Sequence, residues 1–169
     1  MLKEAKEIEK EACVFGYYVR DPRAYGVVEF DENDKVLSLD EKPINPKSNY
    51  AVPCLYFYNP SVVDSAKKLQ PSARGEYKIT DLNKEYLKDD FLQVKQFGRV
   101  FAWLDTGNCE SLLEASNFVE TIKKRQGLYI SCIEEIAWQN RWIDDSQLQT
   151  LGKELEKTAY GQYILSLLD

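Results

Sequence analysis

Histidine is absent from the 169-residue sequence, and this absence limits the chemistry that the chain can perform. Serine and cysteine nucleophiles usually depend on an imidazole as their general base, and many metal sites use imidazole nitrogens. The sequence therefore excludes Ser-His and Cys-His catalysis and imidazole metal sites. Carboxylates, lysine, tyrosine and backbone groups remain for any reaction.

Cysteines are few and far apart, which argues against two further kinds of site. The chain has four of them, each in an apolar context: Cys13, Cys54, Cys109 and Cys132. They have neither the close spacing of zinc ligands nor the density of a disulfide framework. We expect four reduced, buried thiols.

Positive charge and long apolar runs are also scarce. The 22 basic and 28 acidic residues give a formal charge of −6 without any basic block, so nucleic acid is a poor partner. No run approaches the roughly 18 apolar residues of a membrane span, and MLKEAKEIEKEA has a charged helical pattern, unlike a secretory leader. We expect a cytoplasmic protein without a membrane partner.

What is present fits a compact α/β protein. Apolar residues make up 44% and charged residues 30% of the chain, which are ordinary values for a globular domain. Strand and helix patterns alternate in the first part, and only helical patterns follow the glycine at residue 127. We predict an α/β body over residues 1–127 and an all-helical tail over residues 128–169.

Aromatic and β-branched segments predict the strands. They cover residues 13–19, a hairpin of 27–30 with 36–39, residues 50–59, and a pair formed by 92–97 and 100–105. Pro53 lacks a backbone donor, so the strand over residues 50–59 is expected at an edge, at a bulge, or where its backbone serves something else.

The spacing of apolar residues predicts the helices. They cover residues 2–12, residues 60–69, a segment from about Ile79, residues 109–126, and three short segments after residue 128. The segment 109–126 is the clearest, because Leu112 and Val119 share one face and Gly127 supplies a stop.

Asp105 in AWLDTGN ends an apolar stretch and precedes a Thr-Gly turn. Mg²⁺ takes hard oxygen ligands, usually one or two carboxylates plus substrate phosphates, so Asp105 could hold that ion. Alternatively, Asp105 or Thr106 caps the next helix or forms an Asx turn. Both interpretations stay open on these residues alone.

Three other short motifs also have two interpretations each. In DEKP, Glu41 could accept hydrogen bonds from hydroxyls and Lys42 could meet a phosphate, or both mark a charged strand end. Gly26 in AYGVV lets a ligand approach the backbone, or merely allows a turn. Arg74 in SARGE is a phosphate clamp or an ordinary exposed arginine.

Taken in order, these segments resemble the bacterial glucose-1-phosphate thymidylyltransferases, which are sugar-nucleotide pyrophosphorylases. The similar blocks include VFGYYVRDPRAYGVVEFD, LDEKPINPKSNYAV, PSARGEYKITDLNKEYL and GRVFAWLDTGN. The resemblance implies a nucleotidyltransferase that joins glucose 1-phosphate to dTTP, releasing pyrophosphate and making dTDP-glucose for polysaccharide synthesis. It also implies a Rossmann-like mixed, mostly parallel sheet with flanking helices, of which this chain holds part.

The resemblance assigns roles on the sugar side of that reaction. Gly26 and Val52 would touch the glucosyl unit through backbone groups, Glu41 would bind its hydroxyls, and Tyr56 would line the pocket. Directly after Val52, however, Pro-Cys replaces the usual Thr-Gly, so the backbone of this pocket is expected to differ.

The resemblance also assigns phosphate, metal and regulatory residues. Lys42 and Arg74 would meet the sugar-side phosphate, and Asp105 would be one of two aspartates that hold Mg²⁺. A second, regulatory nucleotide site at a subunit interface would include Gly98, Arg99, Ser131, Cys132, Glu135 and Ile136. Ile133 in that region stands where a proline is usual.

Several features of the family's N-terminal part do not occur in this sequence. They are the GxGTRL-type loop around the triphosphate, the basic catalytic residue beside it and the second metal aspartate. The chain thus resembles the C-terminal part, and we expect it to be inactive alone, because catalysis needs both phosphates aligned in one site. An exposed sheet edge and apolar face would favour a homo-oligomer.

Two functional interpretations remain. In the first, the chain is part of a thymidylyltransferase and needs a separate N-terminal half. In the second, it is a non-catalytic regulatory subunit that binds glucose 1-phosphate, a dTDP-sugar or another nucleotide. The choice of dTTP rests on the resemblance alone.

Overall fold

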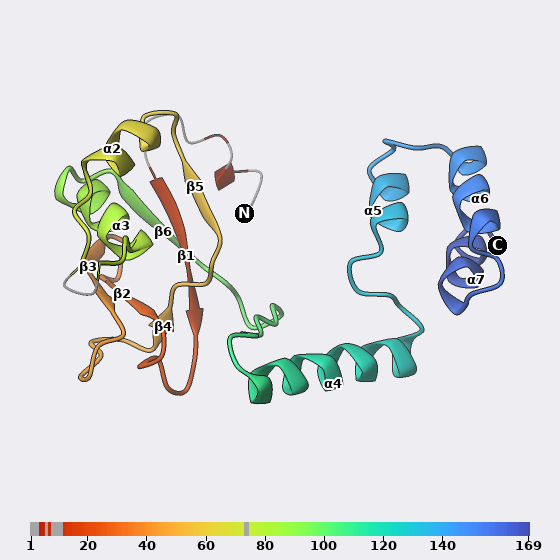
Figure 1. The fold of residues 1–169 in the computed structure, drawn as a ribbon, viewed down its shortest axis with the longest axis horizontal. Coiled ribbons are helices and arrows are strands. Elements are labelled where there is room, and N and C mark those ends of the chain that lie inside the picture. Colours follow the sequence, from red (N-terminus) through yellow and green to blue (C-terminus); the bar gives the residue numbers. More distant parts are fainter. Residues whose placement is uncertain (1–3, 6, 8–11, 73–74) are drawn as a thin grey trace. The chain divides into compact units, whose positions relative to one another are not determined.

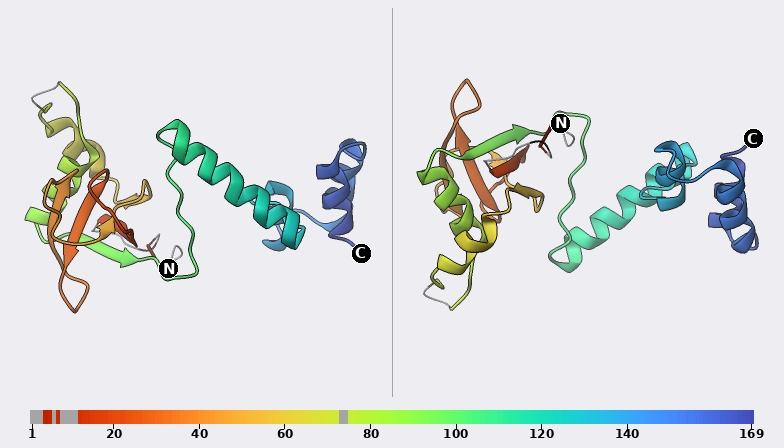
Figure 2. Two further views of the ribbon diagram at one scale, coloured as in Figure 1. Left: turned by 90° about the horizontal axis from the view of Figure 1, so that it is seen from below. Right: turned by 90° about the horizontal axis from the view of Figure 1, so that it is seen from above.

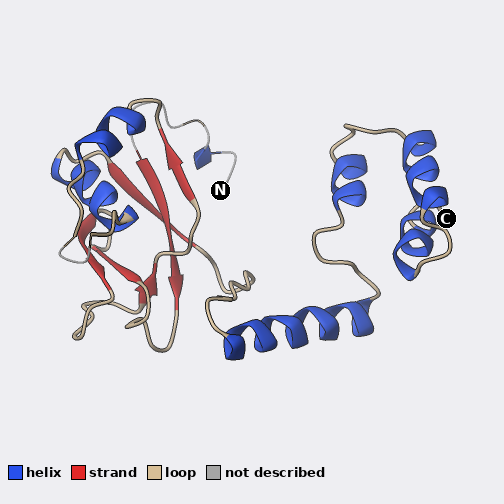
Figure 3. Cartoon of the chain, viewed as in Figure 1, coloured by secondary structure: helices blue, strands red, loops and turns tan. Residues whose placement is uncertain are grey.

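A computed structural model describes residues 4–5, 7, 12–72 and 75–169, and the chain forms two compact units (Figures 1 and 3). The first unit is Met1–Trp103 and the second is Leu104–Asp169. All the described strands belong to the first unit, whereas the second contains helices joined by loops. The boundary predicted at residue 127, between the α/β body and the helical tail, stays a prediction.

Six strands form the sheet among the described residues of the first unit. They are β1 (Ala12–Tyr18), β2 (Gly26–Phe30), β3 (Val36–Glu41), β4 (Tyr50–Ala51), β5 (Tyr56–Tyr58) and β6 (Leu92–Gln96). The order is β3-β2-β4-β1-β5, and β6 also pairs with β1. Only β1 and β6 run parallel among the described strands, and the other pairs are antiparallel. The sheet is mixed, as predicted, but largely antiparallel.

Strand β1 lies inside the sheet and is buried on both faces. Successive side chains of a strand point to opposite faces. Ala12 and Val14 therefore join one core, while Cys13 and Phe15 join another, and all four are fully buried. This explains why the segment is almost continuously apolar, and it confirms the predicted strand.

Two helices, α2 (Val62–Lys68) and α3 (Ile79–Lys88), lie beside the sheet (Figures 1 and 2). Helix α3 packs against β3 and β6, and α2 packs against α3. The buried face of α3 carries Leu82 and Tyr86, which join the core of Val14 and its neighbours. Two polar residues, Thr80 and Asn83, lie on the same buried face.

The β2–β3 hairpin and both helices confirm the predictions, whereas the strand predicted over residues 50–59 is interrupted. Its two ends, β4 and β5, each pair with β1. Between them the chain turns at Pro53, whose carbonyl accepts the Leu55 N–H at 2.7 Å. Proline cannot donate to a ladder, so the pairing stops there.

The strand predicted over residues 100–105 is wrong. No described residue forms a ladder with this segment, and Val100 is 93% exposed. Its apolar residues match the composition of a strand, but a strand also needs a neighbouring strand with which to form hydrogen bonds. The helix predicted over residues 2–12 falls largely outside the described residues, and its last residue, Ala12, begins β1.

The second unit contains α4 (Cys109–Gln126), α5 (Ile133–Gln139), α6 (Asp145–Glu154) and α7 (Ala159–Ser166), which confirm the predicted helices. Cys132, Leu148 and Ile164 form the core around α5, α6 and α7. Helix α4 ends at Gly127, which has a φ of 72°. None of its residues is buried, and no other helix of the second unit packs on its predicted apolar face.

The prediction of four buried thiols is correct for only two of them. Cys13 and Cys132 are buried, whereas Cys54 and Cys109 are exposed. Cys54 follows Pro53, where the chain leaves the sheet, and Cys109 begins the uncovered helix α4. Among the described residues, no helix is long and apolar enough to cross a membrane.

Candidate active site

The first turn of α3 and three strand ends converge at Gly26. Gly26 lies opposite Glu41 in the β2–β3 ladder, and its carbonyl accepts the Val52 N–H at 2.8 Å. A Cβ added at Gly26 would lie 3.5 Å from Glu41 Oε2, 3.5 Å from Thr80 Oγ1 and 3.9 Å from Val52 Cβ. We call Gly26, Glu41, Val52 and Thr80 the Gly26 cluster. Its centre is a small space that any side chain at residue 26 would fill.

Thr80 is a member of this cluster that sequence reasoning missed. It is the second residue of α3, is only 4% exposed, and donates its hydroxyl hydrogen to Glu41 Oε2. A charge-assisted hydrogen bond of this kind orients a carboxylate. One oxygen of Glu41 is thus engaged, and the other forms no hydrogen bond or ion pair with the described residues.

Tyr56 on β5 forms an aromatic wall near the cluster. Burial, followed by the neighbouring Cys54 and Glu41, raises the pKa of Tyr56 to about 12. Tyr56 packs against the same core cluster as Val52. The structure thus brings together three predicted sugar-binding residues, Gly26, Glu41 and Val52, and packs the fourth, Tyr56, against the same core as Val52.

Lys42 follows the cluster directly and has an unusual backbone. Its φ is 47°, and its N–H donates to the carbonyl of Tyr25 at 2.9 Å. Left-handed backbone is uncommon for a residue with a Cβ and is frequent at functional sites. The side chain is exposed, and no ion pair engages its ammonium group within the described residues. Lys42 is therefore available to meet an anion.

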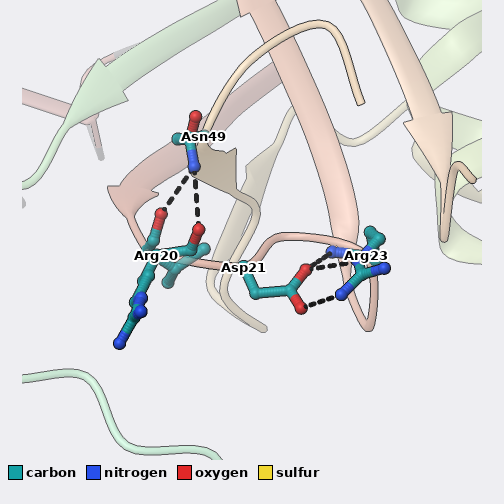
Figure 4. A network of polar contacts seen from close by, with 5 residues as sticks. Arg20, Asp21, Arg23 and Asn49 are labelled. Atoms are coloured by element: carbon teal, nitrogen blue, oxygen red, sulfur yellow. Dashed lines mark hydrogen bonds and ion pairs between the residues drawn. The ribbon is translucent and has the colours of Figure 1, made fainter. Parts of the chain in front are cut away.

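The loop that leads into Gly26 is held by two sets of polar contacts (Figure 4). Asn49 donates its amide hydrogens to two successive loop carbonyls, the second that of Arg20, at 3.0 and 3.1 Å. Arg23 donates twice to the Asp21 carboxylate, at 2.8 and 2.6 Å, and these bonds lower the pKa of Asp21 to about 2. The contacts fix the course of the loop before the pocket glycine.

Asp105 belongs to the second unit, where it lies just before α4. Its carboxylate folds over Gly107, at which an added Cβ would lie 3.3 Å from Asp105 Oδ2. Asn108 caps α4 instead, because its side chain accepts the Ser111 N–H at 2.9 Å. The interpretation of Asp105 or Thr106 as the helix cap is therefore wrong.

The surroundings of the Asp105 carboxylate show whether a metal ion fits there. Its carboxylate forms no hydrogen bond or ion pair with the described part of the chain, so both oxygens are available. A hard cation such as Mg²⁺ fits this donor, but one carboxylate is not a complete site. No group of three or more Cys, Asp or Glu side chains converges within the described residues. Arg74 lies outside them.

Gly98 and Arg99, predicted for a regulatory site, line an aromatic groove in the first unit. Its volume is about 720 Å³. The groove is lined by Tyr17, Tyr18, Tyr50, Gln96, Phe97, Gly98, Arg99 and Phe101. Aromatic rings can stack on a nucleobase, and an arginine can bind phosphate, so the lining suits a nucleotide chemically.

The other predicted regulatory residues surround the start of α5 in the second unit. Cys132 is buried in the core, Ser131 has a φ of 60°, and Ile136 is exposed. Glu135 accepts a hydrogen bond of 2.6 Å from the hydroxyl of Tyr163, whose pKa is raised to about 12 by burial and by this bond. A shared site for these residues and those of the groove stays a prediction.

A family model described as nucleotidyl transferase matches residues 1–122 of the chain. A glucose-1-phosphate thymidylyltransferase of Neisseria gonorrhoeae is 55% identical over 167 residues, which are 99% of this chain and 58% of that protein. One of Mycolicibacterium smegmatis is 56% identical over 93% of this chain and 54% of its own length. The chain thus spans little more than half the length of the curated relatives that it matches.

Solved structures of two related proteins have a similar fold. One, from Bacillus anthracis, is described as a glucose-1-phosphate thymidylyltransferase in complex with sucrose. It matches with a TM-score of 0.62 and 38% identity over 69% of this chain and 46% of its own. The other is a UDP-glucose pyrophosphorylase complexed with UDP-glucose, with a TM-score of 0.58 and 28% identity over 68% and 45% of the two chains.

Proposed function

Because the chain belongs to the nucleotidyl transferase family, we propose that it forms the sugar-phosphate side of a glucose-1-phosphate thymidylyltransferase. The observation that carries this proposal is the Gly26 cluster with Tyr56 beside it. A carboxylate oriented by Thr80, a space without a side chain and an aromatic wall suit a hexose ring. The ring offers hydroxyl donors to the carboxylate and C–H groups to the wall.

Each residue of the pocket has a defined task in this proposal. The free oxygen of Glu41 accepts hydrogen bonds from sugar hydroxyls, and the backbone at Gly26 and Val52 contacts the ring. Lys42 and Arg74 bind the sugar-side phosphate and hold it for in-line attack on the α-phosphorus of dTTP. Asp105 supplies one of two aspartate ligands to Mg²⁺. When bound, this ion would neutralise the charge that develops on the phosphates.

We further propose that the chain alone does not catalyse the transfer. Catalysis requires the nucleotide and the sugar phosphate to be held together in one site. The chain spans 58% of its Neisseria gonorrhoeae relative. The rest of the complete protein would supply the nucleotide side and further strands of a Rossmann-like sheet. Residues 1–127 would be the sugar-phosphate part, and residues 128–169 the helical tail.

A second candidate function is a non-catalytic regulatory subunit, and the aromatic groove supports it. Its rings would stack on the base of a nucleotide or dTDP-sugar, and Arg99 would bind the phosphate. The residues Ser131, Cys132, Glu135 and Ile136 would complete this site in a homo-oligomer. The exposed apolar face of α4 favours such an association.

The proposal is tested by calorimetric titration of the chain with glucose 1-phosphate, with and without Mg²⁺. We expect saturable binding that Glu41→Ala and Lys42→Ala each weaken by at least about tenfold, because charged hydrogen bonds contribute roughly 1.5–3 kcal/mol. Lys47→Ala is the matched control, since Lys47 lies near Glu29 on the surface. Absence of binding in the wild-type chain would contradict the proposal.

The two candidate functions separate when the missing half of a relative is added in trans. Formation of dTDP-glucose from dTTP and glucose 1-phosphate supports the enzyme part. Binding of glucose 1-phosphate or dTDP-glucose without turnover supports the regulatory subunit. Turnover by the chain alone would contradict the proposed inactivity.

A further inference from the structure

A buried polar contact joins α3 to β5 next to the candidate pocket. The hydroxyl of Tyr58 donates to Asn83 Oδ1 at 2.6 Å, and Asn83 is only 1% exposed. A buried amide is costly unless it is hydrogen-bonded, so this contact favours one arrangement of α3 on the strand. The pair does not belong to the Gly26 cluster or to the residues predicted for the site.

Each partner of this contact lies on the same helix or strand as a residue of the candidate pocket, two or three positions away. Asn83 follows Thr80 by three positions on α3, which places them on the same helical face. Tyr58 follows Tyr56 by two positions on β5, and their rings stack with centroids 6.0 Å apart and an interplanar angle of 20°. A shift of α3 along β5 would therefore displace the Thr80 hydroxyl.

Two hydrogen bonds are linked in series through α3. Tyr58 binds Asn83, and Thr80 on the same helix binds Glu41. Because a short helix moves largely as one element, the first bond limits the freedom of the second. The geometry of Glu41 thus depends on a hydrogen bond that does not touch it.

We propose that Tyr58 and Asn83 are positioning residues for Glu41, because their hydrogen bond fixes the register of α3 and so holds the Thr80 hydroxyl on the Glu41 carboxylate. The ligand of this carboxylate, a hexose phosphate, rests on the proposed function. The positioning itself is a property of the free chain and can be tested without any ligand.

The first test compares two variants that each remove one phenolic oxygen. Tyr58→Phe deletes the bond to Asn83 and keeps the ring stack. Tyr163→Phe is the matched control, because it also deletes a phenolic hydrogen bond of 2.6 Å, to Glu135, but within the second unit and not between α3 and β5. We expect Tyr58→Phe to weaken binding of glucose 1-phosphate about fivefold to tenfold and Tyr163→Phe less than about twofold. Equal effects of the two variants would overturn the proposal.

A double-mutant cycle separates positioning from a general loss of stability. Thr80→Val removes the hydroxyl through which the proposed effect reaches Glu41. In that background Tyr58→Phe should weaken binding no further, because residues that act through one contact are not additive. If the two substitutions multiply their effects, Tyr58 acts by another route and the proposal is wrong.

A ligand-free measurement distinguishes this proposal from the proposed function. The side-chain carboxyl ¹³C resonance of Glu41 in the full chain reports its hydrogen bond to Thr80. It should shift in Tyr58→Phe and stay in place in Tyr163→Phe. An unchanged resonance in Tyr58→Phe overturns the positioning. A shift in a chain that binds no glucose 1-phosphate supports the positioning and refutes the sugar-binding function.

Discussion

The two units of this chain are stabilised by different kinds of contact. In the first unit, the candidate pocket joins residues that lie far apart in the sequence, and the Thr80–Glu41 bond spans 39 positions. In the second unit, helix ends are fixed by near neighbours. Asn108 caps α4 through Ser111, and Asp144 caps α6 through Gln147. The pocket of the first unit therefore depends on its sheet, whereas the helix ends of the second unit depend on local signals.

The two units should respond differently to a substitution in their cores. A site assembled by long-range contacts is lost when its core is disturbed, even if every site residue is intact. The local caps of the second unit preserve its helices independently, although α5, α6 and α7 still share the core of Leu148 and Ile164. Substitutions in each core should therefore separate the two units.

The largest expected effect comes from the core of the first unit. Phe15 is 0% exposed, stacks on Phe97 at 4.9 Å and meets Phe57 edge-on at 6.1 Å. Phe15→Ala should lower the free energy of unfolding of this unit by about 3–5 kcal/mol. Binding of glucose 1-phosphate should weaken with it. Thermal unfolding followed by near-ultraviolet and far-ultraviolet circular dichroism would show a first transition at lower temperature.

The matched control lies in the core of the second unit. Ile164 is also 0% exposed. Ile164→Ala should lower the free energy of unfolding of the second unit by about 2–5 kcal/mol without changing glucose 1-phosphate binding. If either substitution lowered both transitions together, the two units would unfold as one, and the contrast between them would not hold.

An effect of intermediate size is expected at Gly26, where function and stability should separate. The Cβ of an alanine would lie at ordinary contact distances of 3.5 Å from Glu41 Oε2 and Thr80 Oγ1. Gly26→Ala should change the unfolding free energy by less than about 1 kcal/mol. It should weaken glucose 1-phosphate binding at least about tenfold, because the methyl group occupies the centre of the cluster.

Calorimetry and urea denaturation of the same preparation measure both quantities. Gly98→Ala is a suitable control, since an added Cβ there has no neighbour within 4 Å among the described residues. Unchanged sugar binding in Gly26→Ala would mean that the space at Gly26 is not used by the ligand.

The sequence was sufficient for the features that depend on near neighbours. The β2–β3 hairpin, α3 and the helices of the second unit follow local periodicity and turn residues. The strand predicted over residues 100–105 failed because its apolar composition says nothing about a partner. Pro53 signalled a disturbance, but the two-part pairing of β4 and β5 with β1 is a long-range property.

Long-range contacts also limited the prediction of the candidate site. Motifs predict Gly26 and Glu41, and the family resemblance adds Val52 and Tyr56; the fold brings the first three together and packs Tyr56 against the same core as Val52. Thr80 was missed because a threonine in the first turn of a helix is unremarkable in KITDLN. Only the fold shows that it faces Glu41. A polar residue on the otherwise apolar face of an amphipathic helix was the signal that could have pointed to it and to Asn83.

The smallest expected effect concerns the exposed pair in the loop before Gly26. Hydrogen bonds from Arg23 lower the pKa of Asp21 from 3.8 to about 2. A carboxyl with a depressed folded-state pKa adds stability above its unfolded pKa, and this contribution is lost as the pH falls through the folded pKa. The stability difference between wild type and Asp21→Asn should thus be constant above about pH 5 and shrink between about pH 4 and pH 2.

This difference should be slight throughout, because the pair is exposed and salt screens it. Urea denaturation at a series of pH values, at low and high salt, measures it. Sugar binding at neutral pH should stay unchanged, since Asn49 holds the loop backbone independently of Asp21. A stability difference between wild type and Asp21→Asn that grows on acidification would contradict the lowered pKa of Asp21. Weakened binding in Asp21→Asn would mean that the loop depends on its ion pair as well as on Asn49, so that even an exposed contact contributes to the long-range assembly of the pocket.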